Sequence, residues 1–60
     1  MTLYEKVKIR AGELNKSISA IEKEAGVANG TIGKWQESKP YAETLQKVAT
    51  VLGVKIEDLL

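Results

Sequence analysis

Apolar residues recur along this chain at intervals of three or four positions, the spacing that places side chains on one face of an α-helix. In the first segment these residues are Leu3, Val7, Ala11 and Leu14. Thr2 and Glu5 have the spacing of a capping box, in which each side chain bonds to the other residue's backbone. We therefore expect a helix from about Leu3 to Leu14, weakened near its end by Gly12.

A second helix is predicted directly after Ser17, a residue type that commonly caps a helix N-terminus. Its apolar positions lie on one face and are Ile18, Ile21 and Ala25. Gly26 follows at the position where a left-handed conformation usually ends a helix. Val27 is then expected to be a buried turn residue.

The next segment predicts a third helix that begins at Ala28 or Asn29 and reaches about Gln36. Its inward face consists of Ala28, Ile32 and Trp35, which follow a helical spacing. The two glycines in this segment together cost about 2 kcal/mol of helix propensity relative to alanine. Either they allow the backbone to approach a ligand closely, or NGTIG is partly a loop, or tertiary packing tolerates the glycines within a helix.

The last third of the chain predicts two more helices. Pro40 biases Lys39 away from helical conformation, so a loop precedes a helix from about Ala42 to Leu52. The apolar stripe of this helix is Leu45, Val48, Ala49 and Leu52, and Gly53 ends it. A short final helix contains Ile56, Leu59 and Leu60. No strand-like alternation competes with this pattern, and we predict an all-α fold.

Two short helices joined by a tight glycine turn, from Ser17 to Lys39, form the pattern of a helix-turn-helix whose second helix enters a DNA groove. The outward positions of that second helix are Asn29, Gly30, Gly33 and Lys34. Asn can bond to N6 and N7 of adenine, and Lys can donate to O6 and N7 of guanine. These four residues are the predicted base contacts.

Phosphate contacts are predicted on both sides of this helix. Lys16 and Ser17 accompany the free N–H groups at the start of the second helix, which favour an anion. After the third helix, the polar residues are Gln36, Ser38, Lys39 and Tyr41. Such contacts position a protein on DNA without reading its sequence. For any one of these residues, the alternative is a solvated side chain without a ligand.

The spacing of the other conspicuous residues predicts structural roles. Trp35 shares its face with Ile32 and is expected in the core, although stacking on a base is the alternative. Tyr4 and Tyr41 are expected to pack with their hydroxyls in water. The charged run from Glu22 to Glu24 is expected to be a solvated helix face.

Composition narrows the possible functions. Sixty residues allow one small domain, residues 1–60, with a formal net charge of +1. The chain has no cysteine and no histidine, which removes disulfides, thiolate metal sites and the usual general base. We expect no cofactor, metal or small-molecule substrate. No apolar run is long enough to span a membrane, and the start lacks the apolar core of a secretory signal. A soluble cytoplasmic protein is expected.

The motifs AGVANGTIGKW and TLQKVATVLGVKIEDLL resemble the Cro/C1-type, or XRE, helix-turn-helix domain of phage repressors and bacterial regulators, in the variety found in Firmicutes and their phages. The resemblance covers about residues 3–60. It implies a compact five-helix, lambda-repressor-like domain, usually dimeric on double-stranded DNA, with the third helix in the major groove. It places Asn29, Gly30, Gly33 and Lys34 in the base-facing slots. It places Thr31, Gln36 and Lys39 where the family commonly meets the DNA backbone.

The sequence departs from this family pattern at several positions. The glutamine that often opens the second helix is Ile18 here, and a serine common among the base-facing positions is Gly33. The usual serine caps are replaced by Ala28, Tyr41 and Lys55. Each lost cap costs about 1 kcal/mol, so a divergent or engineered member of the family is one interpretation.

Three functions follow from these observations. The first is the sequence-specific DNA-binding domain of a transcriptional repressor. The second is a protein-interaction module that keeps the fold but lacks DNA affinity, consistent with the low net charge and the two glycines. The third, an enzyme, is disfavoured by the absence of histidine, cysteine and a phosphate-loop glycine pattern. The terminal Leu59 and Leu60 suggest either a homodimer contact through the last helices or a domain cut from a longer protein.

Overall fold

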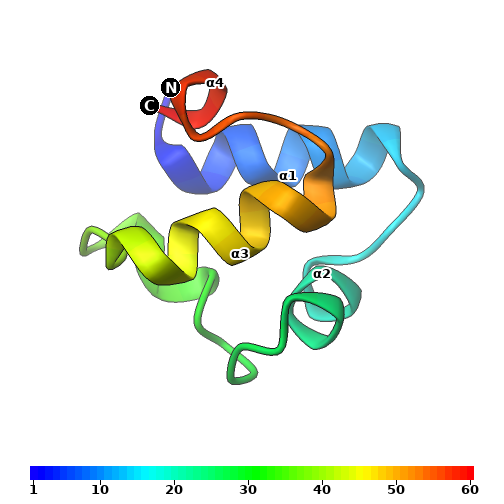
Figure 1. The fold of residues 1–60 in the computed structure, drawn as a ribbon, viewed down its shortest axis with the longest axis horizontal. Helices are drawn as coiled ribbons and strands as arrows, with labels where there is room; N and C mark the ends of the chain where they lie inside the picture. Colours follow the sequence, from blue (N-terminus) through cyan, green and yellow to red (C-terminus); the bar gives the residue numbers. More distant parts are fainter.

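The computed structural model describes residues 1–60, and all its regular elements are helices. It contains α1 (Leu3–Glu13), α2 (Ile18–Ala25), the 3-10 helix η1 (Gly33–Gln36), α3 (Ala42–Leu52) and α4 (Ile56–Leu59). In Figure 1, α3 crosses the middle of the view between α1 above and α2 below, and both chain ends lie near α4. The predicted all-α class is confirmed. None of these helices is both long and apolar enough to cross a membrane.

The N-terminal capping box that Thr2 and Glu5 predict is present. The backbone N–H of Glu5 donates to Thr2 Oγ1 at 3.2 Å, and the backbone N–H of Thr2 donates to Glu5 Oε1 at 3.0 Å. The bond from the Thr2 backbone, with a second from its hydroxyl, holds the pKa of the Glu5 carboxyl below its ordinary value. α1 ends at Glu13, one residue earlier than expected.

A serine and two glycines set three further helix ends as the sequence predicts. Ser17 Oγ accepts the N–H of Ala20 at 3.1 Å at the start of α2. Gly26 and Gly53 end α2 and α3 with φ of 73° and 70°, a left-handed conformation that costs glycine little. Any other residue type at these two positions would strain the backbone, so the glycines fix the C-termini of both helices.

The hydrophobic core joins all five helical elements. Its buried residues are Val7, Ala11, Ile21, Ile32, Trp35, Leu45, Val48, Ala49, Leu52 and Leu59. The whole predicted stripe of α3 is among them, and Leu3, Leu14, Ile18 and Ala25 pack partly buried against the cluster. Val27 is half-buried rather than buried. Trp35 is a core residue, as its spacing with Ile32 predicts.

The third helix differs from the prediction. Residues 29–32 form turns, and only Gly33–Gln36 are helical, in a 3-10 conformation. Gly30 has a φ of +91°, which lies outside the α-helical region, so a regular helix cannot pass through this position. Ala28 is consequently exposed instead of facing the core. The structure agrees with the alternative in which NGTIG is partly a loop.

Two further expectations about side-chain placement were wrong. Glu22 is not on a solvated face: it is 3% exposed and is the one charged residue among the buried ones. Tyr41 does not pack: it is 86% exposed, because it lies on the extended link that precedes α3, at its N-cap position. Tyr4 is partly buried against the core, as expected.

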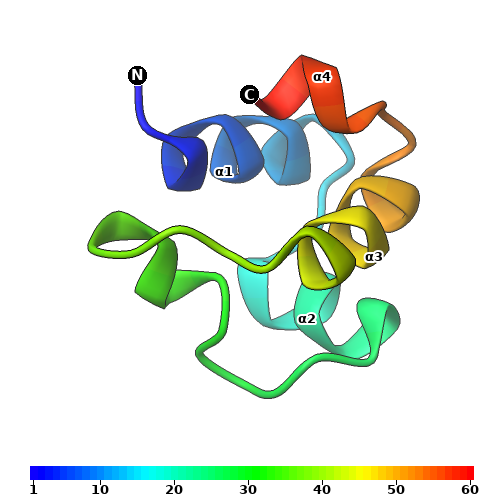
Figure 2. The ribbon, with the colours of Figure 1, turned by 60° about the vertical axis from the view of Figure 1, so that its left-hand side comes forward.

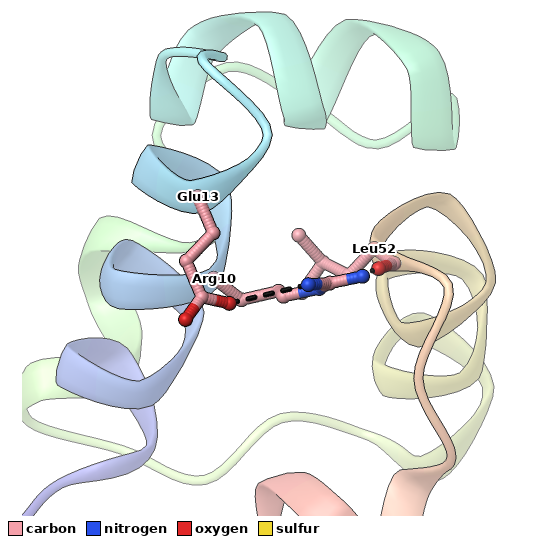
Figure 3. Close-up of polar contacts among 3 residues, drawn as sticks. All are labelled: Arg10, Glu13 and Leu52. Atoms are coloured by element: carbon pink, nitrogen blue, oxygen red, sulfur yellow. Dashed lines mark hydrogen bonds and ion pairs between the residues drawn. The ribbon is translucent and has the colours of Figure 1, made fainter.

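Arg10 links α1 to the end of α3 (Figure 3). Its Nε donates to the backbone carbonyl of Leu52 at 3.0 Å, and its Nη1 lies 3.2 Å from Glu13 Oε1. The last carbonyls of a helix have no partner within the helix and carry partial negative charge. The guanidinium therefore satisfies one of these carbonyls, and its positive charge interacts favourably with the negative end of the α3 dipole.

Replacing Arg10 with methionine is expected to lower the free energy of unfolding by about 1 kcal/mol, because the Leu52 carbonyl loses its charged donor in a partly exposed setting. Glu13→Gln removes only an exposed ion pair and is expected to change stability by less than about 0.5 kcal/mol. Urea unfolding of both variants measures the difference. Equal losses in the two variants would show that the link between α1 and α3 contributes nothing.

Candidate nucleic-acid interface

The segment between α2 and α3 carries the predicted DNA contacts, and we call its residues 28–36 the reading segment. It runs along the lower edge of the molecule in Figure 2 before it turns toward α3. Two side chains anchor it in the core: Ile32 is 0% exposed and Trp35 is 6% exposed. Hydrogen bonds of the turn and 3-10 type hold its backbone, including Thr31 N to Ala28 O at 3.1 Å and Trp35 N to Ile32 O at 3.0 Å.

The predicted base contacts lie on the outer side of the reading segment. Asn29, Gly30 and Lys34 are exposed, and Gly33 is half-buried. Lys34 takes part in none of the ion pairs, which join Arg10 to Glu13, Lys16 to Glu24 and Lys47 to Glu43, and the neutral amide of Asn29 is exposed. The two side chains are thus available to a ligand, and the two glycines leave the backbone between them uncovered.

The predicted phosphate contacts before α2 are partly engaged within the chain. Lys16 Nζ lies 2.8 Å from Glu24 Oε1, so this ammonium already has a carboxylate partner. Ser17 Oγ accepts an α2 N–H and keeps its own hydroxyl proton to donate. The positive character of this corner therefore rests mainly on the free N–H groups of the first turn of α2.

The other predicted phosphate contacts gather after η1. A hollow of about 180 Å³ is lined by Thr31, Lys34, Trp35, Ser38, Lys39, Pro40, Tyr41 and Thr44. The structure thus brings four of the five remaining predicted residues around one site. Gln36 does not line it, and its Nε2 donates to Gly33 O at 3.2 Å.

The hollow adjoins the N-terminus of α3, because Tyr41 at the N-cap and Thr44 in the first turn both line it. Tyr41 occupies the N-cap position without making a side-chain cap, so the first N–H groups of the helix are open to an anion. Thr44, in the first turn of α3, contributes a hydroxyl-bearing side chain to the hollow. Sequence reasoning missed Thr44, although the lost serine cap at position 41 indicates that this helix end is unsatisfied.

Glu22 is the second residue that sequence reasoning missed. From α2 it reaches the reading segment, where Oε1 accepts the N–H of Gly30 at 3.1 Å and Oε2 accepts the N–H of Ile32 at 2.8 Å. The signal was present in the sequence. Glu22 follows Ile18 by four positions and precedes Ala25 by three, so it shares their inward face of α2.

Known structures resemble this arrangement closely. The P22 c2 repressor, in a crystal structure "in complex with synthetic operator 9T in the presence of Tl+", matches with a TM-score of 0.88 at 27% identity, over 100% of this chain and 94% of that one. The nuclear magnetic resonance structure of the P22 c2 repressor DNA-binding domain matches at 0.87 and 26% identity, over 98% and 80%. This chain has the fold of a phage-repressor DNA-binding domain.

A third structure supports the repressor-like fold at lower identity. Prophage Lp1 protein 11 matches with a TM-score of 0.80 at 23% identity, over 95% of this chain and 79% of that one, and at this identity it supports the fold alone. No protein-family model matches the sequence, and no curated protein sequence matches it. The similarity to repressors is therefore found by comparing structures. It has four α-helices and one 3-10 helix, where five helices were expected.

Proposed function

We propose that residues 1–60 act as the sequence-specific DNA-binding domain of a transcriptional repressor, with the reading segment in the major groove. One observation carries the proposal: the whole chain shares its fold with a phage repressor solved on its operator. The exposed pair Asn29 and Lys34 on a buried anchor of Ile32 and Trp35 is what such a reading element requires.

Only a few side chains are placed to form hydrogen bonds with the bases. Asn29 offers an amide that can donate and accept at once, the pattern that pairs with N6 and N7 of adenine, and Lys34 offers donors for guanine O6 and N7. Gly30 and Gly33 place backbone instead of side chains against the groove. The reading face is therefore sparse, and two residues supply most of the direct discrimination between bases.

Phosphates are held by the N-termini of α2 and α3, the helices that precede and follow the reading segment in the chain. The hollow at the start of α3 offers open N–H groups beside Lys39, Thr31, Ser38 and Tyr41, and an anion is stabilised there by the helix dipole as well. Lys16 and Ser17 occupy the corresponding corner of α2. Contacts of this kind fix the register on the duplex and make affinity depend on salt.

Finer assignments follow from the same proposal. Within repressor-like proteins, the motif around Gly26 and Trp35 favours the Cro/C1-type variety of Firmicutes and their phages. The protein would act on DNA in the cytoplasm without catalysing a reaction. A homodimer through the C-terminal helices is supported by the exposed Leu60 after α4, and the exposed Met1 and Ile9 lie beside α4 and extend this apolar side. Sedimentation at rising protein concentration tests this contact.

Selection of duplexes from a random library at fixed salt tests the proposed function. We expect an enriched sequence and an affinity whose logarithm falls linearly with the logarithm of salt concentration. Lys39→Ala should weaken enriched and random duplexes by the same factor and reduce the salt slope by about one. Lys34→Ala should weaken the enriched duplex more than the random one, because it removes a base contact.

The alternative function, a protein-interaction module on the same fold, is favoured by the net charge of +1 and by the ion pair that occupies Lys16. It predicts no enriched sequence and no dependence on salt. Selection that enriches no sequence, together with the absence of salt-dependent binding to any duplex, would support this alternative and contradict the proposal.

A further inference from the structure

Glu22 is a buried charge whose place in the structure calls for an explanation. Burying a carboxylate is costly unless it is fully hydrogen-bonded, and Glu22 is 3% exposed. Each of its oxygens accepts one N–H, from Gly30 and from Ile32. Both donors belong to the reading segment and neither belongs to α2, so the carboxylate is directed at that segment alone.

The two bonds fix two peptide planes, and the Asn29–Gly30 plane has no other hydrogen bond, whereas Thr31 O also accepts the N–H of Lys34 at 3.3 Å. The N–H of Gly30 belongs to the peptide unit that joins it to Asn29, and the N–H of Ile32 belongs to the unit that joins it to Thr31. η1 has no side-chain cap, and Gly30 can adopt many conformations besides its φ of +91°. The carboxylate therefore holds the Asn29–Gly30 peptide in one orientation and, with it, the base-facing side chain of Asn29.

The main chain of Glu22 contributes to the same link. Its carbonyl accepts the N–H of Val27 at 3.1 Å, beyond the left-handed Gly26. One residue thus ties both the turn and the reading segment to α2. The surface beside it is a hollow lined by Ser19, Glu22, Lys23, Val27 and Asn29, so Asn29 and Glu22 line the same hollow.

We propose that Glu22 is a positioning residue for DNA recognition: its carboxylate holds the N–H groups of Gly30 and Ile32 and preorganises Asn29 for base contact. This inference rests on the proposed function for its effect on DNA, and on the hydrogen bonds for its effect on the segment. A segment held in advance loses less conformational freedom on binding, and the affinity is correspondingly higher.

The direction in which DNA affinity changes when the Glu22 charge is removed distinguishes a positioning role from a purely electrostatic one. A carboxylate near DNA repels phosphate, so its removal by electrostatics alone tightens binding. Glu22→Gln instead turns one acceptor oxygen into an N–H₂ donor that faces a backbone N–H. We expect the folded variant to bind the enriched duplex roughly tenfold more weakly, since the DNA contacts must then also organise the segment.

Glu24→Gln is the matched control, because it removes the same charge from the same helix at an exposed position paired with Lys16. It should bind DNA as tightly as the wild type or more tightly. Amide hydrogen exchange supplies the readout without DNA. In the wild type, the N–H groups of Gly30 and Ile32 should be protected, and the N–H of Asn29 should not. In Glu22→Gln, protection at both positions should fall while that of α1 and α3 is kept.

Each result decides the proposal. Unchanged exchange at Gly30 and Ile32 in Glu22→Gln, or DNA affinity equal to that of Glu24→Gln, overturns it. If Glu22→Gln does not fold, unprotected Gly30 and Ile32 amides in the wild type overturn it, and protected ones support the carboxylate clamp. If the wild type binds no duplex, the proposed repressor function fails, the DNA role of Glu22 fails with it, and the exchange data still show whether the clamp exists.

Discussion

Trp35→Ala is expected to lower the free energy of unfolding by about 3–5 kcal/mol, which is typical for removing a buried large aromatic side chain. Trp35 is 6% exposed and lies in η1, which packs against α1. A 60-residue domain is stable by only about 3–9 kcal/mol in total. Circular dichroism and urea unfolding should therefore show a protein that is largely unfolded at 37 °C.

Tyr41→Ala is the control for this prediction. Tyr41 is an aromatic residue six positions later in the chain, but it is 86% exposed, and its loss should change stability by less than about 0.5 kcal/mol. A Trp35→Ala variant as stable as Tyr41→Ala would contradict the assignment of Trp35 to the core. It would then favour the alternative in which this tryptophan stacks on a base.

The combined replacement Asn29→Ala with Lys34→Ala is expected to remove nearly all base discrimination while leaving the fold intact. Each side chain is exposed, so stability should change little, and each good base contact is worth roughly 1–3 kcal/mol. The preference for the enriched duplex over a random one should fall about 10²- to 10⁴-fold. Binding that remains should be salt-dependent and indifferent to sequence, because the phosphate contacts persist.

Lys8→Ala provides the comparison for charge. It removes one positive charge from an exposed position of α1, outside the reading segment, and should leave the preference between duplexes unchanged. Competition binding of the variants to enriched and random duplexes gives the ratio directly. If the double variant keeps the wild-type preference, bases are read by other residues or through DNA shape, and the sparse reading face described above is incorrect.

The regular helices could be predicted because local signals agree with tertiary packing. The capping box at Thr2, the serine at position 17 and the glycines at positions 26 and 53 each mark a helix end, and the structure uses all four. The apolar stripe of α3 is buried as its spacing predicts. Where capping, periodicity and burial favour the same conformation, the sequence alone determines the element.

The reading segment could not be predicted in the same way because its local signals conflict. Ile32 and Trp35 have a spacing compatible with a helix, whereas Gly30 favours a positive φ. The conflict is resolved by a contact from another element, the Glu22 carboxylate of α2. The helical periodicity of α2 predicts that Glu22 faces inward, whereas its charge predicts that it faces the solvent. The structure also shows what the sequence could not, that Lys16 is paired with Glu24.

The central claim is that the outer side of the reading segment binds the DNA groove. Amide chemical-shift changes during titration of the labelled protein with the enriched duplex, or with a random duplex if none is enriched, test it most directly. We predict the largest changes at residues 16–18 and 28–39 and at the first residues of α3, 41–44, with those changes weakening steeply as salt rises. Changes confined to α1 and α4, or changes independent of salt, would contradict the account.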